Sequence, residues 1–174
     1  VVYLENITFD GNYSAPVMRS ASSVSFTSFT AKNCTFTGGS FGLYFSENSS
    51  STIGTMELTD CNFTNNAHIG LYCGKPVETC TITGGTVSGN GNTSTGEEID
   101  GITIGNVQKV GIQFYDQTTN GTTQNITISG VTFENNCNGN ANGYSRADII
   151  TSYGYAPAAG STLTVEACSF DALG

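Results

Sequence analysis

The sequence predicts an all-β solenoid, a single-stranded right-handed parallel β-helix of about six to seven coils with three short strands per coil. Three observations lead to this prediction. One pattern of apolar and polar residues recurs six times along the 174 residues. Within each repeat, apolar residues alternate with polar ones, which is typical of a strand with one buried face. Gly and Asn follow each alternating stretch, and these residues adopt left-handed turn conformations at low cost.

Six segments align without a gap, and each supplies two strands. They are residues 1–12, 28–39, 55–66, 79–90, 125–136 and 162–173. One aligned column contains Phe9, Phe36, Phe63, Val87, Phe133 and Phe170. Each repeat has two alternating stretches offset by one extra residue, and this offset indicates a corner between two strands. Because a solenoid stacks equivalent residues of successive coils, we expect the aligned column to form a ladder in the core.

A third strand follows the turn in four repeats, at 42–45, 70–73, 111–114 and 147–151. Along the aligned column the spacings are 27, 27, 24, 46 and 37 residues (9 to 36, 36 to 63, 63 to 87, 87 to 133 and 133 to 170). We interpret the spacing of 46 as two coils of 23, with a middle coil around 101–114. The spacing of 37 is interpreted as one coil with an insertion at 136–146. Residues 1–174 then form a single β-helix domain, either a processed chain or part of a longer solenoid.

This repeat resembles the right-handed parallel β-helix repeat family, with its pectin-lyase-like architecture, over nearly the whole chain. The resemblance implies the fold but no single activity, because that scaffold supports lyases, hydrolases, phage spikes and adhesins. Polygalacturonase-type hydrolases of this architecture carry N-T-D, D-D, G-H-G and R-I-K motifs. Only residues 99–102 are similar to any of these motifs, and His68 has no flanking glycines.

Composition limits the classes of partner. The 14 acidic residues outnumber five basic ones, the net charge is −9, and the basic residues are not clustered. This balance argues against a nucleic-acid partner, since binding a phosphate backbone requires clustered Lys and Arg. No apolar run approaches the ~18 residues of a membrane span. Neither the composition nor the motifs of the sequence imply a cofactor.

Cysteine and Asn usage points to an oxidising environment, and so to an extracellular or cell-surface location. The chain has six Cys but no CxxC pair, a usage typical of secreted proteins. Cys73 and Cys80 flank a short corner and are the favoured disulfide pair, whereas Cys34 and Cys61 are expected to be stacked buried thiols. Eight N-x-S/T sequons are candidate glycosylation sites, although a composition rich in Ser and Thr also produces sequons. They are Asn6, Asn12, Asn33, Asn48, Asn62, Asn92, Asn120 and Asn125.

Two further features are candidate binding sites. Glu97, Glu98 and Asp100 form the densest acidic group, which predicts either weak cation binding or a solvated loop. Tyr44 and Tyr72 share one column of the third strand and are expected to point outward, where a sugar ring could stack on them. No catalytic residue and no complete metal site can be assigned from the sequence.

The ends of the repeat suggest a role. The first repeat begins at residue 1 and the last ends at residue 173, so we expect end coils without polar caps. Such ends associate with copies of the same chain or with adjoining coils of a longer chain. The sequence therefore favours a non-catalytic structural or adhesive surface protein that assembles end to end. The alternative is a carbohydrate-active module (polysaccharide binding, lyase or glycoside hydrolase), so enzymatic activity stays open.

Overall fold

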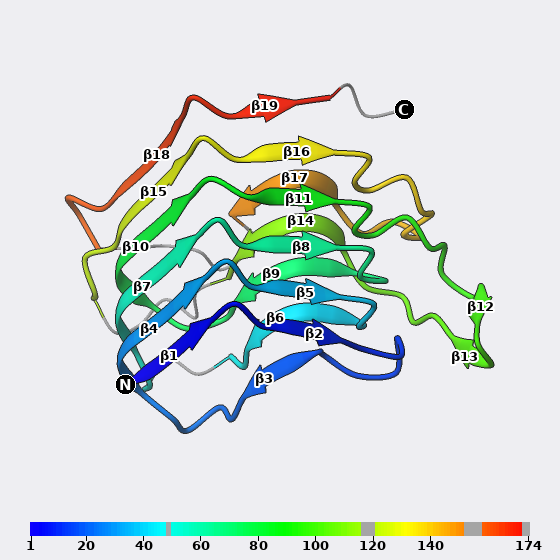
Figure 1. The fold of residues 1–174 in the computed structure, drawn as a ribbon, viewed down its shortest axis with the longest axis horizontal. Helices are drawn as coiled ribbons and strands as arrows, with labels where there is room; N and C mark the ends of the chain where they lie inside the picture. Colours follow the sequence, from blue (N-terminus) through cyan, green and yellow to red (C-terminus); the bar gives the residue numbers. More distant parts are fainter. Residues whose placement is uncertain (48–49, 116–120, 152–157, 172–174) are drawn as a thin grey trace.

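The computed structural model describes residues 1–47, 50–115, 121–151 and 158–171. The chain is a parallel β-helix, in which three parallel sheets enclose one core (Figure 1). Consecutive strands of these three sheets belong to different sheets, and each of the first five coils adds one strand to each sheet. This arrangement confirms the predicted fold class. Among the described residues, no helix is long and apolar enough to cross a membrane.

The strands of each sheet come from successive coils. Sheet A contains β1 (Val2–Glu5), β4 (Phe26–Lys32), β7 (Ile53–Thr59), β10 (Val77–Thr83), β15 (Asn125–Ser129) and β18 (Thr162–Glu166). Sheet B contains β2 (Thr8–Asp10), β5 (Thr35–Thr37), β8 (Asn62–Thr64), β11 (Thr86–Ser88), β16 (Thr132–Glu134) and β19 (Ser169–Phe170). Sheet C contains β3 (Met18–Ser20), β6 (Phe41–Phe45), β9 (Ile69–Cys73), β14 (Lys109–Phe114) and β17 (Arg146–Thr151).

The aligned aromatic column forms a ladder in the core, in the predicted register. Its central members are at most 1% exposed, namely Phe36, Phe63, Val87 and Phe133. Phe36 stacks on Phe9 and on Phe63, with ring centroids 5.2 Å apart in both pairs. Phe133 stacks on Phe170 at 4.8 Å. Since adjacent parallel strands lie about 4.8 Å apart, each ring covers the ring of the next coil.

The corner between sheets A and B is a single residue in the left-handed conformation. The six members of this column are Asn6 (φ 56°), Asn33 (49°), Asp60 (51°), Gly84 (64°), Gly130 (65°) and Ala167 (51°). All except Ala167 are residue types that enter this region readily. This is the extra residue that separates the two alternating stretches of every repeat. It turns the chain so that the next apolar side chains again face the core.

A buried Asn ladder holds the turn between sheets B and C. Asn66, Asn90 and Asn136 are each at most 1% exposed. The Nδ2 atom of Asn66 donates to Oδ1 of Asn90 (2.8 Å), and Nδ2 of Asn90 donates to Oδ1 of Asn136 (3.1 Å). Each Nδ2 also donates to a backbone carbonyl of the preceding coil. The amides therefore satisfy polar groups that would otherwise be costly to bury.

A glycine column leads from this turn into sheet C. A Cβ atom at Gly42 would lie 2.5 Å from the carbonyl oxygen of Gly70, and one at Gly70 would lie 2.8 Å from that of Gly111. Neither distance allows a side chain. The Gly at the predicted start of the third strands at 42–45 and 70–73 is therefore required by the close approach of successive coils.

The spacing of 46 residues is one coil, so the prediction of a middle coil is wrong. β10 pairs directly with β15, and β11 with β16. Residues 91–108 leave the rod as a loop that carries a short antiparallel hairpin, β12 (Glu98–Ile99) with β13 (Ile102–Thr103) (Figure 1). The alternating residues at 101–104 belong to this hairpin, which is why they resembled a coil strand. The described residues therefore form six coils, of which the last has strands in sheets A and B only. The spacing of 37 is one coil with an insertion, as predicted.

Replacing a central ladder residue should destabilise the whole rod. We expect Phe63→Ala to lower the free energy of unfolding by about 3–5 kcal/mol, because neighbouring coils keep the cavity from closing. Thr64→Ala, one residue further and on the outer face, should change it by no more than about 0.5 kcal/mol. Urea titration of both variants checks this expectation. Equal losses would contradict the inward assignment of Phe63.

Candidate functional site

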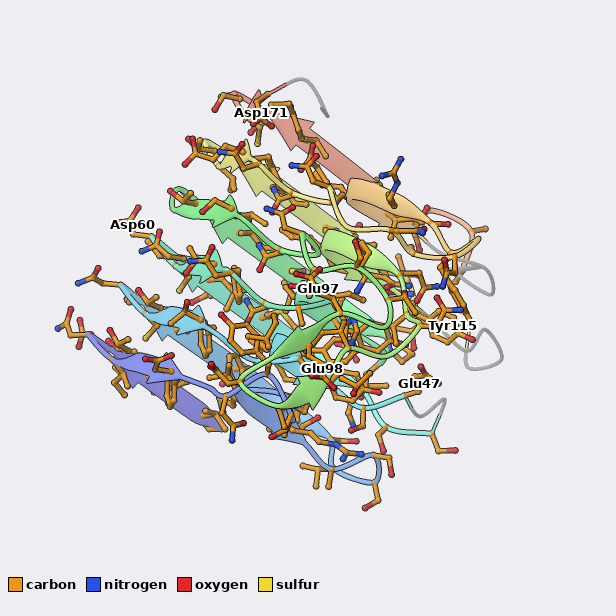
Figure 2. The ribbon with its side chains drawn as sticks, turned by 90° about the vertical axis from the view of Figure 1, so that its right-hand side faces the viewer. Glu47, Asp60, Glu97, Glu98, Tyr115 and Asp171 are labelled. Atoms are coloured by element: carbon orange, nitrogen blue, oxygen red, sulfur yellow. The ribbon has the colours of Figure 1, made fainter. Side chains whose placement is uncertain are left out.

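Ionisable side chains gather where the 91–108 loop leaves the rod, at the outer side of sheet C. Figure 2 is turned toward this side and shows Glu97 and Glu98 on the loop, whereas Glu47 and Tyr115 follow the opposite ends of β6 and β14. Lys109, the first residue of β14, is fully buried here and packs against Gly91. A buried lysine needs hydrogen-bond acceptors for its ammonium group, so its contacts indicate what it does.

Lys109 contacts the turn of the preceding coil. Its Nζ atom donates to the carbonyl oxygen of Ala67 (3.2 Å) and lies 3.0 Å from Nδ1 of His68. A charged lysine only donates hydrogen bonds, so Nδ1 of His68 accepts and the ring is neutral. Burial first, and Lys109 second, lower the pKa of His68 to about 4. Burial also lowers the pKa of Lys109 to about 8, an effect that Glu97 opposes. The pair joins two coils.

The acidic residues of the loop take part in the structure of the loop itself. Oε2 of Glu97 accepts a hydrogen bond from the backbone N–H of Ser94 (2.8 Å). Asp100 and Gly101, with φ of 50° and 79°, form the tight turn of the β12–β13 hairpin, a role that suits an Asp-Gly pair. Throughout the described residues, no three His, Cys, Asp or Glu side chains lie close enough to hold a metal ion. The solvated-loop interpretation of Glu97, Glu98 and Asp100 fits this geometry.

Tyr44 and Tyr72 share an outward column, as expected, but they do not present their faces for sugar stacking. The two rings stack on each other with centroids 4.9 Å apart, and Tyr115 packs on Tyr72 at 6.1 Å. Tyr72 is only 5% exposed, and its hydroxyl donates to a carboxylate oxygen of Glu47. Burial first, and Glu47 second, raise the pKa of Tyr72. Sequence reasoning placed these rings on the correct face but could not show that successive coils bring them into contact.

Gln113 continues the same column between Tyr72 and Ile150 and is fully buried. Among the described residues, neither Nε2 nor Oε1 of its amide group has a hydrogen-bond partner. An unpaired buried amide costs about 1–3 kcal/mol. Nothing in the sequence distinguishes this Gln from the exposed polar residues of other strands.

The predicted Cys73–Cys80 disulfide is not formed, because each sulfur fills a different core column. Cys73 stacks between Phe45 and Phe114 in sheet C, and its Sγ atom donates to the carbonyl oxygen of Lys75 (3.4 Å). Cys80 pairs with Met56 and Ile126 in sheet A and is a fully buried thiol. Burial raises the pKa of the Cys80 thiol well above its ordinary value. Buried Cys34 and Cys61 are thiols in adjacent coils, as expected.

Lys75 is a second buried lysine, and the sequence analysis missed its role. It is 1% exposed, and its Nζ atom donates to the carbonyl oxygens of Ala21 (3.0 Å), Ser22 (2.6 Å) and Val24 (2.8 Å). Those carbonyls belong to the connection before β4, so one ammonium group secures an irregular segment more than fifty residues away in sequence. A lone Lys at an otherwise apolar corner is the only sequence signal for this contact.

The sequons that the structure describes lie on the outer surface. Asn62 is half-buried, while Asn6, Asn12, Asn33, Asn92 and Asn125 are exposed. Asn33 donates to Oδ1 of Asn6 (2.8 Å) along the corner column. Asn48 and Asn120 lie outside the described residues.

Comparisons of this chain with protein-family models, curated proteins and solved structures found no match.

Buried His68 should make stability depend on pH. Its pKa of about 4 in the folded protein lies below the ordinary 6.5. As the pH falls, the unfolded chain therefore binds the proton before the folded protein does. The free energy of unfolding should fall by roughly 3 kcal/mol between pH 6.5 and pH 4. His68→Gln keeps an acceptor for Lys109 but does not titrate, so this part of the loss should disappear. Urea titrations of both proteins across this range measure the difference. An equal fall in the free energy of unfolding for both proteins would contradict the lowered pKa of His68.

Proposed function

We propose that this chain is a non-catalytic structural module, extracellular or on the cell surface, whose end coils associate end to end with further copies of the chain or with adjoining coils of a longer chain. The exposure of the core columns at the last coil carries the proposal. Leu163, Val165 and Phe170 are 40%, 41% and 50% exposed, whereas the residues one coil inward in the same columns are at most 1% exposed. Apolar surface and open strand edges of this kind favour association.

The two ends are complementary in register. Val2, Leu4 and Phe9 of the first coil occupy the same columns as the exposed residues of the last coil. Placing the first coil of one copy on the last coil of another pairs β18 with β1 and β19 with β2, a form of β-augmentation. Each backbone hydrogen bond gained contributes about 0.5–1.5 kcal/mol. Phe9 would then stack on Phe170 as Phe170 stacks on Phe133.

The outer columns of the same junction carry like charges. Continued register brings Glu5 beside Glu166 and Asp10 beside Asp171, each about one strand spacing apart. Exposed charges at this distance repel, and salt screens the repulsion. The junction should therefore be weakest at low ionic strength.

The contacts of the buried ionisable groups support a non-catalytic role. Lys75, Lys109 and Tyr72 are at most 5% exposed, and each is hydrogen-bonded to another part of the chain. A general acid or base must come within hydrogen-bond reach of a substrate. These three groups instead connect different coils.

Sedimentation of the 174-residue chain over a concentration series tests the association. We expect linear oligomers whose size increases with concentration, and more of them at about 1 M salt than at about 0.01 M. Val165→Lys places a charge at the open end of a core column and should abolish association. Thr81→Lys, on the outer face of β10, adds the same charge elsewhere and should not. A folded chain that remains monomeric at high concentration and high salt would rule out self-association, leaving coils of a longer polypeptide to cover the ends.

The extracellular location has its own test. Native protein should carry glycan on at least one exposed sequon, and we expect it first at Asn92, which lies in the loop outside the sheets. Peptide mapping by mass spectrometry, before and after enzymatic deglycosylation, measures the occupancy of each site. Unmodified Asn at every exposed sequon in native material would contradict the glycoprotein assignment.

Carbohydrate binding is the second candidate function, and with it a relation to the pectin-lyase-like families. One observation favours it, an open groove on the outer face of sheet A whose eight lining residues include four Thr, one Ser and Glu78.

A further inference from the structure

The sequence contains four Asn-Gly pairs, which begin at Asn90, Asn120, Asn138 and Asn142. In such a pair the backbone nitrogen of the glycine can attack the side-chain amide carbon of the asparagine. The reaction closes a small, unstrained ring, and glycine has no Cβ atom to hinder the approach. Asn120 lies outside the described residues. The structure places the other three pairs in different surroundings.

The Asn90–Gly91 pair is held at both of its reacting groups. Asn90 is fully buried, and its Nδ2 atom donates to the carbonyl oxygen of Phe63 (2.7 Å) and to Oδ1 of Asn136 (3.1 Å). The N–H of Gly91 donates to the carbonyl oxygen of Asn66 (2.8 Å). Reaction here would require both groups to leave the Asn ladder, and so the coils to separate.

In the Asn138–Gly139 pair the asparagine is exposed, but the glycine is enclosed. The N–H of Gly139 donates to the carbonyl oxygen of Gly91 (2.9 Å). A Cβ atom at Gly139 would lie 2.4 Å from the carbonyl oxygen of Thr93. The nitrogen that would attack therefore lies between the 91–108 loop and the 136–146 insertion, and it becomes available only when these two segments part.

The Asn142–Gly143 pair occupies the exposed tip of a tight turn. The N–H of Tyr144 donates to the carbonyl oxygen of Ala141 (3.0 Å), and φ is 43° at Asn142 and 92° at Gly143. Positive φ at both central residues is typical of a type I′ turn, for which Asn-Gly is a preferred pair. A Cβ atom at Gly143 would meet nothing beyond the adjacent residues within 4 Å. Within the described part of the chain, neither the side chain of Asn142 nor the N–H of Gly143 has a hydrogen-bond partner.

We propose that Asn142 is a site of spontaneous covalent modification, converted to aspartate and isoaspartate in the folded chain while Asn90 and Asn138 are preserved. The nitrogen of Gly143 forms a bond to Cγ of Asn142. The bond from Cγ to the side-chain nitrogen breaks, and ammonia leaves with the proton of the Gly143 N–H. Water then opens the cyclic imide, at Cγ to give aspartate or at the backbone carbonyl to give isoaspartate.

The modification changes the 136–146 insertion but not the rod. Isoaspartate adds one methylene group to the main chain, so the turn from Ala141 to Tyr144 cannot keep its closing hydrogen bond in the same geometry. Ala141 is 3% exposed, and the neighbouring Asn140 bonds to Ser94 and Thr95 of the 91–108 loop. Either product also adds a negative charge to a chain whose net charge is −9. The contact between the two loops thereby acquires a charge that increases with the age of the protein.

Mass spectrometry of the chain incubated at mildly alkaline pH tests the proposal, with fragment ions locating each conversion of amide to acid. In the folded chain Asn142 should be converted at least about tenfold faster than Asn90 or Asn138, because their glycine nitrogens react only after the contacts around them open. In concentrated urea the three residues should be converted at comparable rates, since only the Asn-Gly sequence then matters. The two buried or enclosed pairs are therefore controls within the same chain.

Asn142→Gly is the matched variant. Gly-Gly also suits a type I′ turn, so the insertion should fold as before without the reacting amide. In the original chain, hydrogen exchange at Thr95 should become faster as the product accumulates, because the altered turn loosens the bond from Thr95 to Asn140. In the variant the same incubation should leave this exchange unchanged.

The proposal is overturned if Asn142 remains intact in the folded chain, or if either of the other two pairs is converted as fast. It is also overturned if exchange at Thr95 rises equally in the variant. None of these outcomes depends on whether the ends associate.

Discussion

Stacking of equivalent residues about 4.8 Å apart is the constraint on which the rest of this structure depends. At that distance a residue must be compatible with the same position in the coils on either side. The chain meets this requirement in three ways: Phe rings that stack, Asn amides that bond to one another, and glycines that leave room for a neighbouring carbonyl group. The left-handed corner residue makes all three possible, because it returns every coil to the same phase.

The two buried lysines lie where this regular stacking is interrupted. Lys75 binds the irregular connection before β4, and Lys109 lies where the 91–108 loop leaves the rod. The loops also follow the stacking rule beyond the sheets. Thr95 N donates to Asn140 O, and Gly139 N donates to Gly91 O, so two long excursions from successive coils bond to each other.

Most of the fold could be predicted from the sequence, because two alternating stretches, an offset and a turn recur in fixed phase. Burial of Phe36, Phe63 and Phe133 follows from that pattern alone. The hairpin at 98–103 could not be recognised, since its alternation is the same as that of a coil strand. Contacts between distant segments were also beyond reach. The sequence indicates that Tyr44 and Tyr72 face outward but not that they stack. A lone Lys at an apolar corner likewise does not indicate that Lys75 binds carbonyls near residue 22.

The direction of the hydrogen bonds between coils has a mechanical consequence. In a β-helix these bonds run along the rod, so tension applied to the two ends loads them in the direction in which they break. Each coil contacts only its neighbours, and resistance is therefore not shared along the length. Under load, a rod of this kind would peel coil by coil from an end instead of failing as a unit. It would resist compression and bending better than stretching, which suits a stalk or spacer more than a tether.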